Sequence, residues 1–201
     1  MSWKKAALLF LLLTPLFNLL TVLVLPTAIN TLVMHRIADK GVEGAAEPDA
    51  RPEAQRRKAE VIAHSGINVA LPAPRADASA RTVVRPSPDL LYTACVFDLA
   101  EGPLHITAPV QDGYVSVSGF GADSSNFFAV NDRSAQRDAE GHKHFDLLLT
   151  RGESVSAPVG ARVIISPSTR GLVLFRSLIP DEAALPQLIA DYQVNQLCKP
   201  L

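Results

Sequence analysis

The run LYTACVFD, residues 91–98, is the first of seven short segments rich in Val, Ile, Tyr, Phe and Thr that follow Val83. Each segment has the length and the residue types of a β-strand, and the side-chain pattern has a period of two. Gly, Pro, Asp and Asn separate the segments. The predicted strands are 91–98, 104–108, 114–119, 126–130, 144–150, 163–166 and 172–179.

Turn residues occupy the short connections between these strands, among them Gly102, Gly113 and Gly152. Glycine accepts the positive φ angles that tight turns require. Connections this short favour antiparallel neighbours, because a parallel pair needs a crossover of about a dozen residues or more. We therefore predict an all-β domain with an antiparallel β-sandwich or jelly-roll-like fold.

A helix is expected at the C-terminal end of this domain. Pro186 suits the first helical turn, and Leu185, Leu188, Ile189 and Tyr192 follow one another at helical spacing. These four side chains share one face of the helix, and we expect that face to dock on the sandwich.

Ahead of the domain, no charged side chain occurs between Ala6 and Val33. The segment from Ala6 to Leu25 is long enough for a transmembrane helix, which crosses about 30 Å of hydrocarbon at about 1.5 Å per residue. A cleaved secretory signal is the alternative, but its apolar region would span only about 7 to 15 residues. A membrane anchor is therefore favoured.

The composition of the segment after the anchor changes to Ala, Pro and charged residues, which is typical of a tether. Its one expected helix begins at Pro52. The transmembrane helix is expected to leave the hydrocarbon at Pro26, Asn30 and Thr31. The chain thus divides into three predicted parts: a transmembrane anchor at 1–33, a tether with a short helix at 34–82 and a β-sandwich at 83–201.

The charged residues indicate on which side of the membrane the domain lies and which class of partner does not bind it. Lys4 and Lys5 form a short basic tail before the first apolar helix, which favours a cytoplasmic N-terminus. The domain is then expected on the periplasmic, extracytoplasmic side of the inner (plasma) membrane of a bacterial envelope. The net charge is −1, and no basic run is interleaved with aromatic residues. The sequence therefore excludes nucleic acid as a partner and indicates the lipid bilayer as one.

The two cysteines, Cys95 and Cys198, permit at most one internal disulfide. In an oxidising compartment such a bond would close a loop of roughly 100 residues. The alternative is a free thiol at Cys95, buried in an apolar strand, with Cys198 near a frayed terminus. The sequence leaves the pairing open and favours the free thiol.

The segment RPSPDLLY, residues 85–92, resembles the opening signature PNPDTLY of the bacterial family known as domain of unknown function 1254. Ser87 and Leu90 stand where the signature has Asn and Thr, which weakens any site built on those two polar groups. Further landmarks of the family follow in its order, and the resemblance covers about residues 83–201. They are Asp98-Leu99, Gly102-Pro103, Pro109, Asp112-Gly113-Tyr114, Asn126-Phe127, Ser166-Pro167-Ser168, Leu174 to Ile179, and the helix from Leu185-Pro186 to Tyr192.

The resemblance implies a β-sandwich of unassigned activity. Members of this family are often found beside, or fused to, a sister family known as domain of unknown function 1214. A separately encoded protein that resembles the 1214 family is therefore the partner that the resemblance implies.

Five polar residues on the family-like motifs are the candidate ligand-binding residues: Asp89, Tyr92, Asp98, Asn126 and Arg176. Each also has a structural interpretation. The acids can cap a turn or end a strand, the amide can bond a loop, and the guanidinium can pair with either acid.

His142 and His144 would point to the same face of a strand, and Asp146 shares that face. Such a set could hold a metal ion. The turn-like cluster from Asp138 to Gly141 favours instead a solvated hairpin end, and His105 is expected to be an ordinary core or surface histidine. We expect no cofactor. The leading hypothesis is a membrane-tethered binding or interaction module, and the alternative is a metal-dependent envelope enzyme that uses the two histidines.

Overall fold

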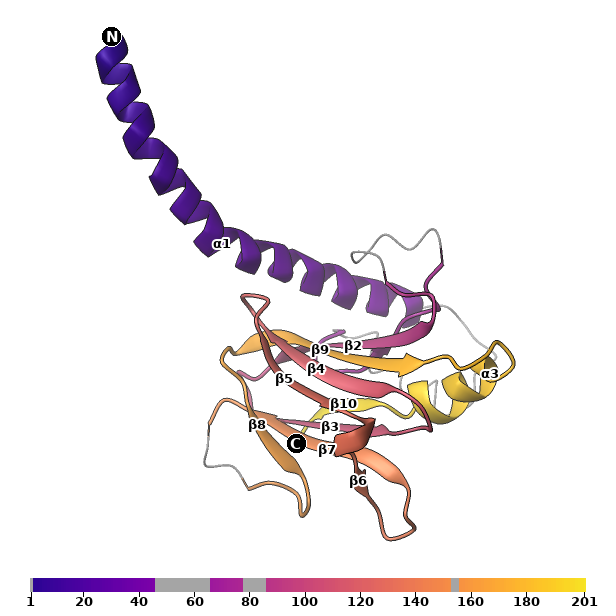
Figure 1. Ribbon diagram of the computed structural model, residues 1–201. Coiled ribbons are helices and arrows are strands. Elements are labelled where there is room, and N and C mark those ends of the chain that lie inside the picture. Colours follow the sequence, from indigo (N-terminus) through magenta and orange to yellow (C-terminus); the bar gives the residue numbers. More distant parts are fainter. Residues whose placement is uncertain (1, 46–65, 78–85, 153–155) are drawn as a thin grey trace.

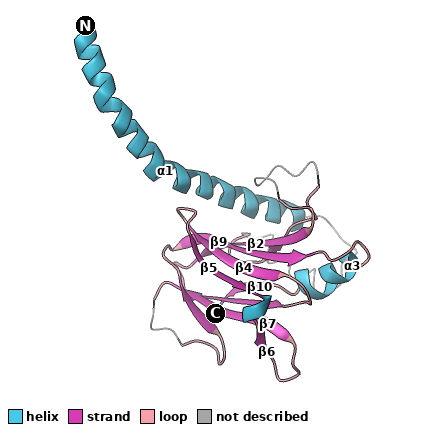
Figure 2. Cartoon of the chain, in the orientation of Figure 1, coloured by secondary structure: helices cyan, strands magenta, loops and turns pink. Residues whose placement is uncertain are grey.

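The computed structural model of the chain describes residues 2–45, 66–77, 86–152 and 156–201. Within these residues, a long N-terminal helix leads to two packed β-sheets (Figure 1). Figure 2 shows that strands form both layers, whereas the helical segments lie outside them. The short helix predicted from Pro52 lies outside the described residues.

The first sheet, sheet A, has five strands, and all its neighbouring strands are antiparallel. A bulge between Gly119 and Phe120 shifts the register of its last pair. In spatial order the strands are β1 (Leu71–Pro72), β2 (Leu90–Asp98), β9 (Arg170–Leu178), β4 (Val115–Gly121) and β5 (Asn126–Asn131).

The second sheet, sheet B, also has five strands, and its central strand is β7 (Lys143–Thr150). Three short helical segments complete the domain: η1 (Asp132–Ser134), α3 (Leu185–Leu188) and the π-helical η2 (Ile189–Gln193). The remaining strands of sheet B are β10 (Leu197–Pro200), β3 (Leu104–Pro109), β6 (Gln136–Arg137) and β8 (Arg162–Ile165).

The predicted all-β sandwich is confirmed, and each of the seven predicted strands is present within two residues at either end. One detail of the prediction is wrong, because β8 pairs with β7 in parallel. Residues 151–161 connect the two strands, and a connection of this length approaches the dozen residues of a crossover. Three further strands were not predicted: β1 and β6, which have two residues each and are too short to show a period of two, and β10, which lies where a frayed terminus was expected.

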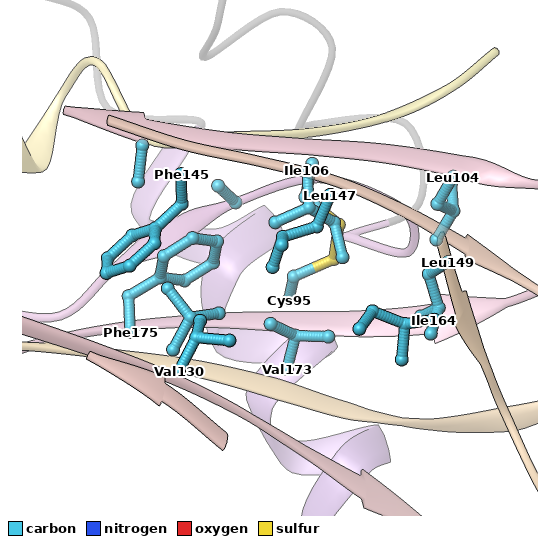
Figure 3. Close-up of a cluster of buried hydrophobic side chains, with 14 of the residues drawn as sticks. Cys95, Leu104, Ile106, Val130, Phe145, Leu147, Leu149, Ile164, Val173 and Phe175 are labelled. Carbon is cyan, nitrogen blue, oxygen red and sulfur yellow. A yellow bond between two sulfur atoms is a disulfide. The ribbon is translucent and has the colours of Figure 1, made fainter. Parts of the chain in front are cut away.

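The hydrophobic core lies between the two sheets. Phe97, Phe175 and Val173 of sheet A meet Phe145 and Ile106 of sheet B, and each of the five is almost fully buried. Figure 3 shows this packing, with leucines at one end of the core. Burial of apolar surface of this extent is the main stabilising contribution to the sandwich.

A disulfide joins Cys95 on β2 to Cys198 on β10, and so links sheet A to sheet B through the core (Figure 3). The prediction of a free thiol at Cys95 is therefore wrong, because the C-terminal residues around Cys198 are not frayed. β10 pairs with β3 along its whole length, with Cys198 opposite Ile106, and this register turns the Cys198 side chain inward.

The docking of the C-terminal helix is confirmed. Leu188 is buried against Leu91 and Ile179, with Leu185 and Tyr192 packed beside them. The fourth predicted contact, Ile189, is 37% exposed. It begins the π-helical turn, in which Val194 donates its backbone N–H to the carbonyl of Ile189. The wider turn changes the helical spacing on which the predicted face depended.

Helix α1 (Trp3–Ala45) is longer than the predicted span, and Pro15 and Pro26 lie within it. The segment from Trp3 to Lys40 is long and apolar enough to cross a membrane, and the side chains of its most apolar part are exposed. Figure 1 shows the helix curving, as expected where a proline removes a backbone donor.

The last turns of α1 dock on the outer face of sheet A (Figure 1). Asn30, Met34 and Ala38 are buried at i, i+4 and i+8. Asn30 Nδ2 donates hydrogen bonds to the carbonyl oxygens of Gly121 at 2.7 Å and Ala122 at 3.2 Å. Asn30 therefore contacts the β4–β5 hairpin, a contact that the sequence did not predict.

We expect Asn30→Ala to release the C-terminal part of α1 from sheet A, because two backbone carbonyls lose their donor. The loss of such hydrogen bonds is worth about 1–3 kcal/mol, so tryptic cleavage at the exposed Arg36 should accelerate about tenfold in neutral detergent. Thr31→Ala is the control, since Thr31 is exposed and bonds only to the carbonyl of Thr27 within the helix. Equal cleavage rates in the two variants would contradict the docking.

We expect the double variant Cys95→Ala, Cys198→Ala to unfold at a lower urea concentration than the native protein. The disulfide closes a loop with a sequence separation of 103 residues. A loop of about 100 residues contributes up to about 4.7 kcal/mol through the entropy of the unfolded chain. Dithiothreitol should lower the urea midpoint of the native protein and leave the double variant unchanged. An unchanged midpoint in the native protein would refute the bond.

Candidate functional site

The five predicted ligand-binding residues lie at two opposite ends of sheet A. Tyr92 and Arg176 are direct register partners on β2 and β9, and Asp89 precedes β2 at the same end. Asp98 closes β2 at the other end, six residues and therefore about 20 Å from Tyr92. Asn126 begins β5 at the same end of the sheet as Asp98, since it pairs with Phe120 of β4, but β9 and β4 lie between the two residues. The structure thus brings together Tyr92 and Arg176.

Asn126 has a structural role in its part of the sheet. Its side-chain amide donates hydrogen bonds to the carbonyl oxygens of Gly119 and Phe128, both at 3.1 Å. These bonds join β4 and β5 at the bulge where the register between the two strands shifts.

Asp98 also has structural partners. Its carboxylate accepts hydrogen bonds from Arg170 Nε at 2.7 Å and from the backbone N–H of Ala100 at 2.9 Å. Asn68 donates to the Asp98 carbonyl and accepts from its backbone N–H. Partial burial would raise the pKa of Asp98, but the Ala100 N–H and the Arg170 guanidinium outweigh it and hold the pKa below the usual value.

A row of four polar residues crosses the outer face of sheet A at the Tyr92 end. Tyr92, Arg176, Ser116 and Asn131 are successive register partners on β2, β9, β4 and β5. Their chain neighbours, such as Phe175, point into the core, so these four side chains point outward. We call these residues the polar row.

Two atoms of the polar row are buried without a hydrogen-bond partner: Arg176 Nε and Ser116 Oγ. Sequence reasoning selected Tyr92 and Arg176 but missed Ser116 and Asn131. The alternation of Ser116 with Val115 and Val117 was the available signal for its outward direction. The register that sets it beside Arg176 depends on pairing between β4 and β9, which are far apart in the sequence.

The three predicted metal ligands do not converge. His142 is exposed at the hairpin end, where its Nδ1 lies 3.3 Å from Asp138 Oδ2. Asp146 Oδ1 lies 2.6 Å from Nε2 of His105, a histidine for which no specific partner was predicted. Within the described ranges, no three His, Cys, Asp or Glu side chains lie close enough to hold a metal ion together.

A small cavity lies beside β7, next to His144 and Asp146. Its volume of about 20 Å³ suits one water molecule and is too small for an organic substrate. His144 Nδ1 is buried without a hydrogen-bond partner, and a water in this cavity would satisfy it. The other lining residues are Val130, Ser134, Gln136, Phe145, Leu147 and Arg162.

The chain matches the family described as "Protein of unknown function (DUF1254)" over residues 67–200. No curated protein matches it. The solved VPA0106 protein from Vibrio parahaemolyticus is similar with a TM-score of 0.52 and 13% identity, over 87% of this chain and 38% of that chain. An uncharacterized protein from Burkholderia cenocepacia matches with a TM-score of 0.43 and 18% identity, over 67% of this chain and 42% of that chain.

The likeness to the Vibrio protein is one of fold. The chain spans about two fifths of the length of these two solved proteins.

We expect the Asp98 carboxylate to stabilise the fold only where it is ionised. Because its pKa is lowered in the folded state, its contribution is complete above the ordinary carboxyl pKa of about 3.9 and disappears as the pH falls through the lowered folded value. Arg170 is mostly exposed, so Asp98→Asn should lower the unfolding free energy at pH 7 by at most about 1 kcal/mol.

Urea unfolding of the native protein and Asp98→Asn at several pH values measures this contribution. The two unfolding free energies should converge as the pH falls through the lowered folded-state pKa of Asp98. Asp112→Asn, in an exposed turn, is the control and should follow the native protein. A difference that grows as the pH falls would contradict the assignment.

Proposed function

This chain belongs to the family described as Protein of unknown function (DUF1254), and on that basis we propose that it is a membrane-anchored binding or interaction module. Its sandwich lies on the periplasmic side of the inner membrane and binds a partner without turnover. The observation that carries this proposal is helix α1, which is apolar enough to cross a membrane and docks on the disulfide-linked sandwich.

The disulfide supports the periplasmic location independently of the basic tail. Bonds such as Cys95–Cys198 form and persist in oxidising compartments, which include the bacterial periplasm, and are rare in the reducing cytosol. Lys4 and Lys5 indicate the same orientation, with the short N-terminus in the cytoplasm. Two separate physical arguments therefore agree.

The docking of α1 also gives the two sheets different surroundings. Asn30, Met34 and Ala38 cover part of the outer face of sheet A, and the apolar part of α1 leaves from the same side (Figure 1). Sheet A then faces the bilayer, and the outer face of sheet B faces the aqueous compartment.

β8 is the surface of sheet B that we propose for a protein partner. Within the described strands it pairs only with β7, so its other edge is open. Val163 and Ile165 on β8 are 41% and 48% exposed, and the nearby Val159 is fully exposed. An open edge strand with exposed apolar side chains can accept another chain by strand addition.

The partner that we propose is a separately encoded protein resembling the domain of unknown function 1214 family, as the family resemblance implies.

We expect a photo-crosslinking amino acid at position 163 to label one recurrent envelope protein in intact cells. Tyr114 is the matched control position, because it has the same 41% exposure and directly precedes β4 of sheet A. Adding Ile165→Lys should reduce the labelling about tenfold, because a charge is then desolvated in the interface, while the unfolding midpoint stays unchanged.

Equal labelling from positions 163 and 114, or capture of abundant bystanders alone, would contradict the interaction surface. Protection of the sandwich from protease added to spheroplasts would contradict the periplasmic location.

A further inference from the structure

The four residues of the polar row on sheet A all have side chains that can donate hydrogen bonds to one ligand. Tyr92, Arg176, Ser116 and Asn131 are neighbours across four adjacent strands. Directly opposed side chains in an antiparallel sheet have Cβ atoms about 4.5–5.5 Å apart. The row therefore presents one continuous polar strip on the outer face of sheet A, next to apolar side chains such as Leu174.

Arg176 is the unusual member of the row. Its Nε is buried without a hydrogen-bond partner, and none of the ion pairs in the described part of the chain includes it. Ser116 is 4% exposed, and its Oγ also lacks a partner. Buried polar atoms in native proteins are nearly always hydrogen-bonded, so these two atoms on neighbouring residues are both available to one acceptor.

The other two members of the row can also donate. The hydroxyl oxygen of Tyr92 accepts the backbone N–H of Ser87 at 2.9 Å, which leaves its own proton for another acceptor. Asn131 Oδ1 accepts from the backbone N–H of Arg133 at 3.1 Å, which leaves the amide NH2 group for the same use. No carboxylate occupies a register position in this row.

We infer that the polar row is a binding site for a phosphate group, with Arg176 as its charged member and Ser116, Tyr92 and Asn131 as neutral donors. A guanidinium binds two oxygens of a phosphate through parallel N–H groups, and the remaining oxygens accept from the hydroxyl and amide groups. The inference rests on the proposed periplasmic binding module, since it names the ligand class of that module's sheet A.

A lipid headgroup and free phosphate are two sources of this chemistry. The polar row shares its face with docked α1, and Asn30 holds that helix to the opposite end of β4. The row therefore lies on the same outer face of sheet A as the docked part of α1.

The test follows the Arg176 Nε–H resonance of the full-length, 15N-labelled protein while inorganic phosphate is added in neutral maltoside micelles. Chloride at equal ionic strength corrects for screening. The lipid arm places the protein in phosphate-free buffer, in nanodiscs of phosphatidylcholine with or without phosphatidylglycerol. A shift on adding phosphate supports a soluble ligand, and a shift on adding phosphatidylglycerol supports a headgroup.

Arg176→Gln should raise the phosphate dissociation constant about tenfold or more, and Ser116→Ala about three- to tenfold, because hydrogen bonds to a charged group are lost. These variants are followed through the backbone N–H of residue 177. Arg176→Lys should also weaken binding, because lysine keeps the charge but lacks the planar fork. Arg170→Gln removes an exposed charge from the same strand and should change the constant less than about twofold.

The inference is overturned if neither phosphate nor phosphatidylglycerol moves the Arg176 resonance, or if Arg176→Gln and Arg170→Gln weaken binding equally. Crosslinking at position 163 with no response at Arg176 would refute the phosphate site and leave the protein-interaction proposal standing. A response at Arg176 without crosslinking at position 163 would support the phosphate site and contradict the protein-interaction proposal.

Discussion

The bond between Cys95 and Cys198 crosses the aromatic core and joins sheet A to sheet B, and the rest of the domain depends on this connection. Apolar burial holds the sheets together but is non-directional, so it does not fix the position of the last strand. The disulfide fixes that position, because it holds β10 beside β3 and thereby completes sheet B. Because the sheets are joined, the relative orientation of their two outer faces is fixed. The two faces can therefore have separate roles.

Helix α1 makes the two outer faces unequal. A flexible tether would let the sandwich turn freely above the membrane, whereas burial of Met34 and the Asn30 hydrogen bonds attach the helix to sheet A. The apolar segment of α1 and the part that docks on sheet A therefore belong to one continuous helix. Gly66 extends this attachment, since its φ of +61° and its close approach to Ala38 leave no room for a side chain.

The outward faces carry different chemistry. Sheet A has a strip of donors centred on Arg176, on the side of the anchor, whereas sheet B ends in an open strand with exposed Val163 and Ile165. The His105–Asp146 pair lies between strands β3 and β7 of sheet B and satisfies both side chains. Among the described residues, Arg176 and Ser116 are thus neighbours in one row whose buried side-chain atoms have no hydrogen-bond partner, whereas His105 and Asp146 are paired with each other.

The sequence by itself determined the apolar anchor, the seven principal strands, the C-terminal helix and the family, because each depends on local periodicity or on motifs in order. Tertiary structure alone decided the disulfide, the parallel β7–β8 pair, the docking of Asn30 and the neighbourhood of Arg176 and Ser116. These features depend on register between segments far apart in the chain. A pattern of period two shows that a strand exists, but not which strand lies beside it.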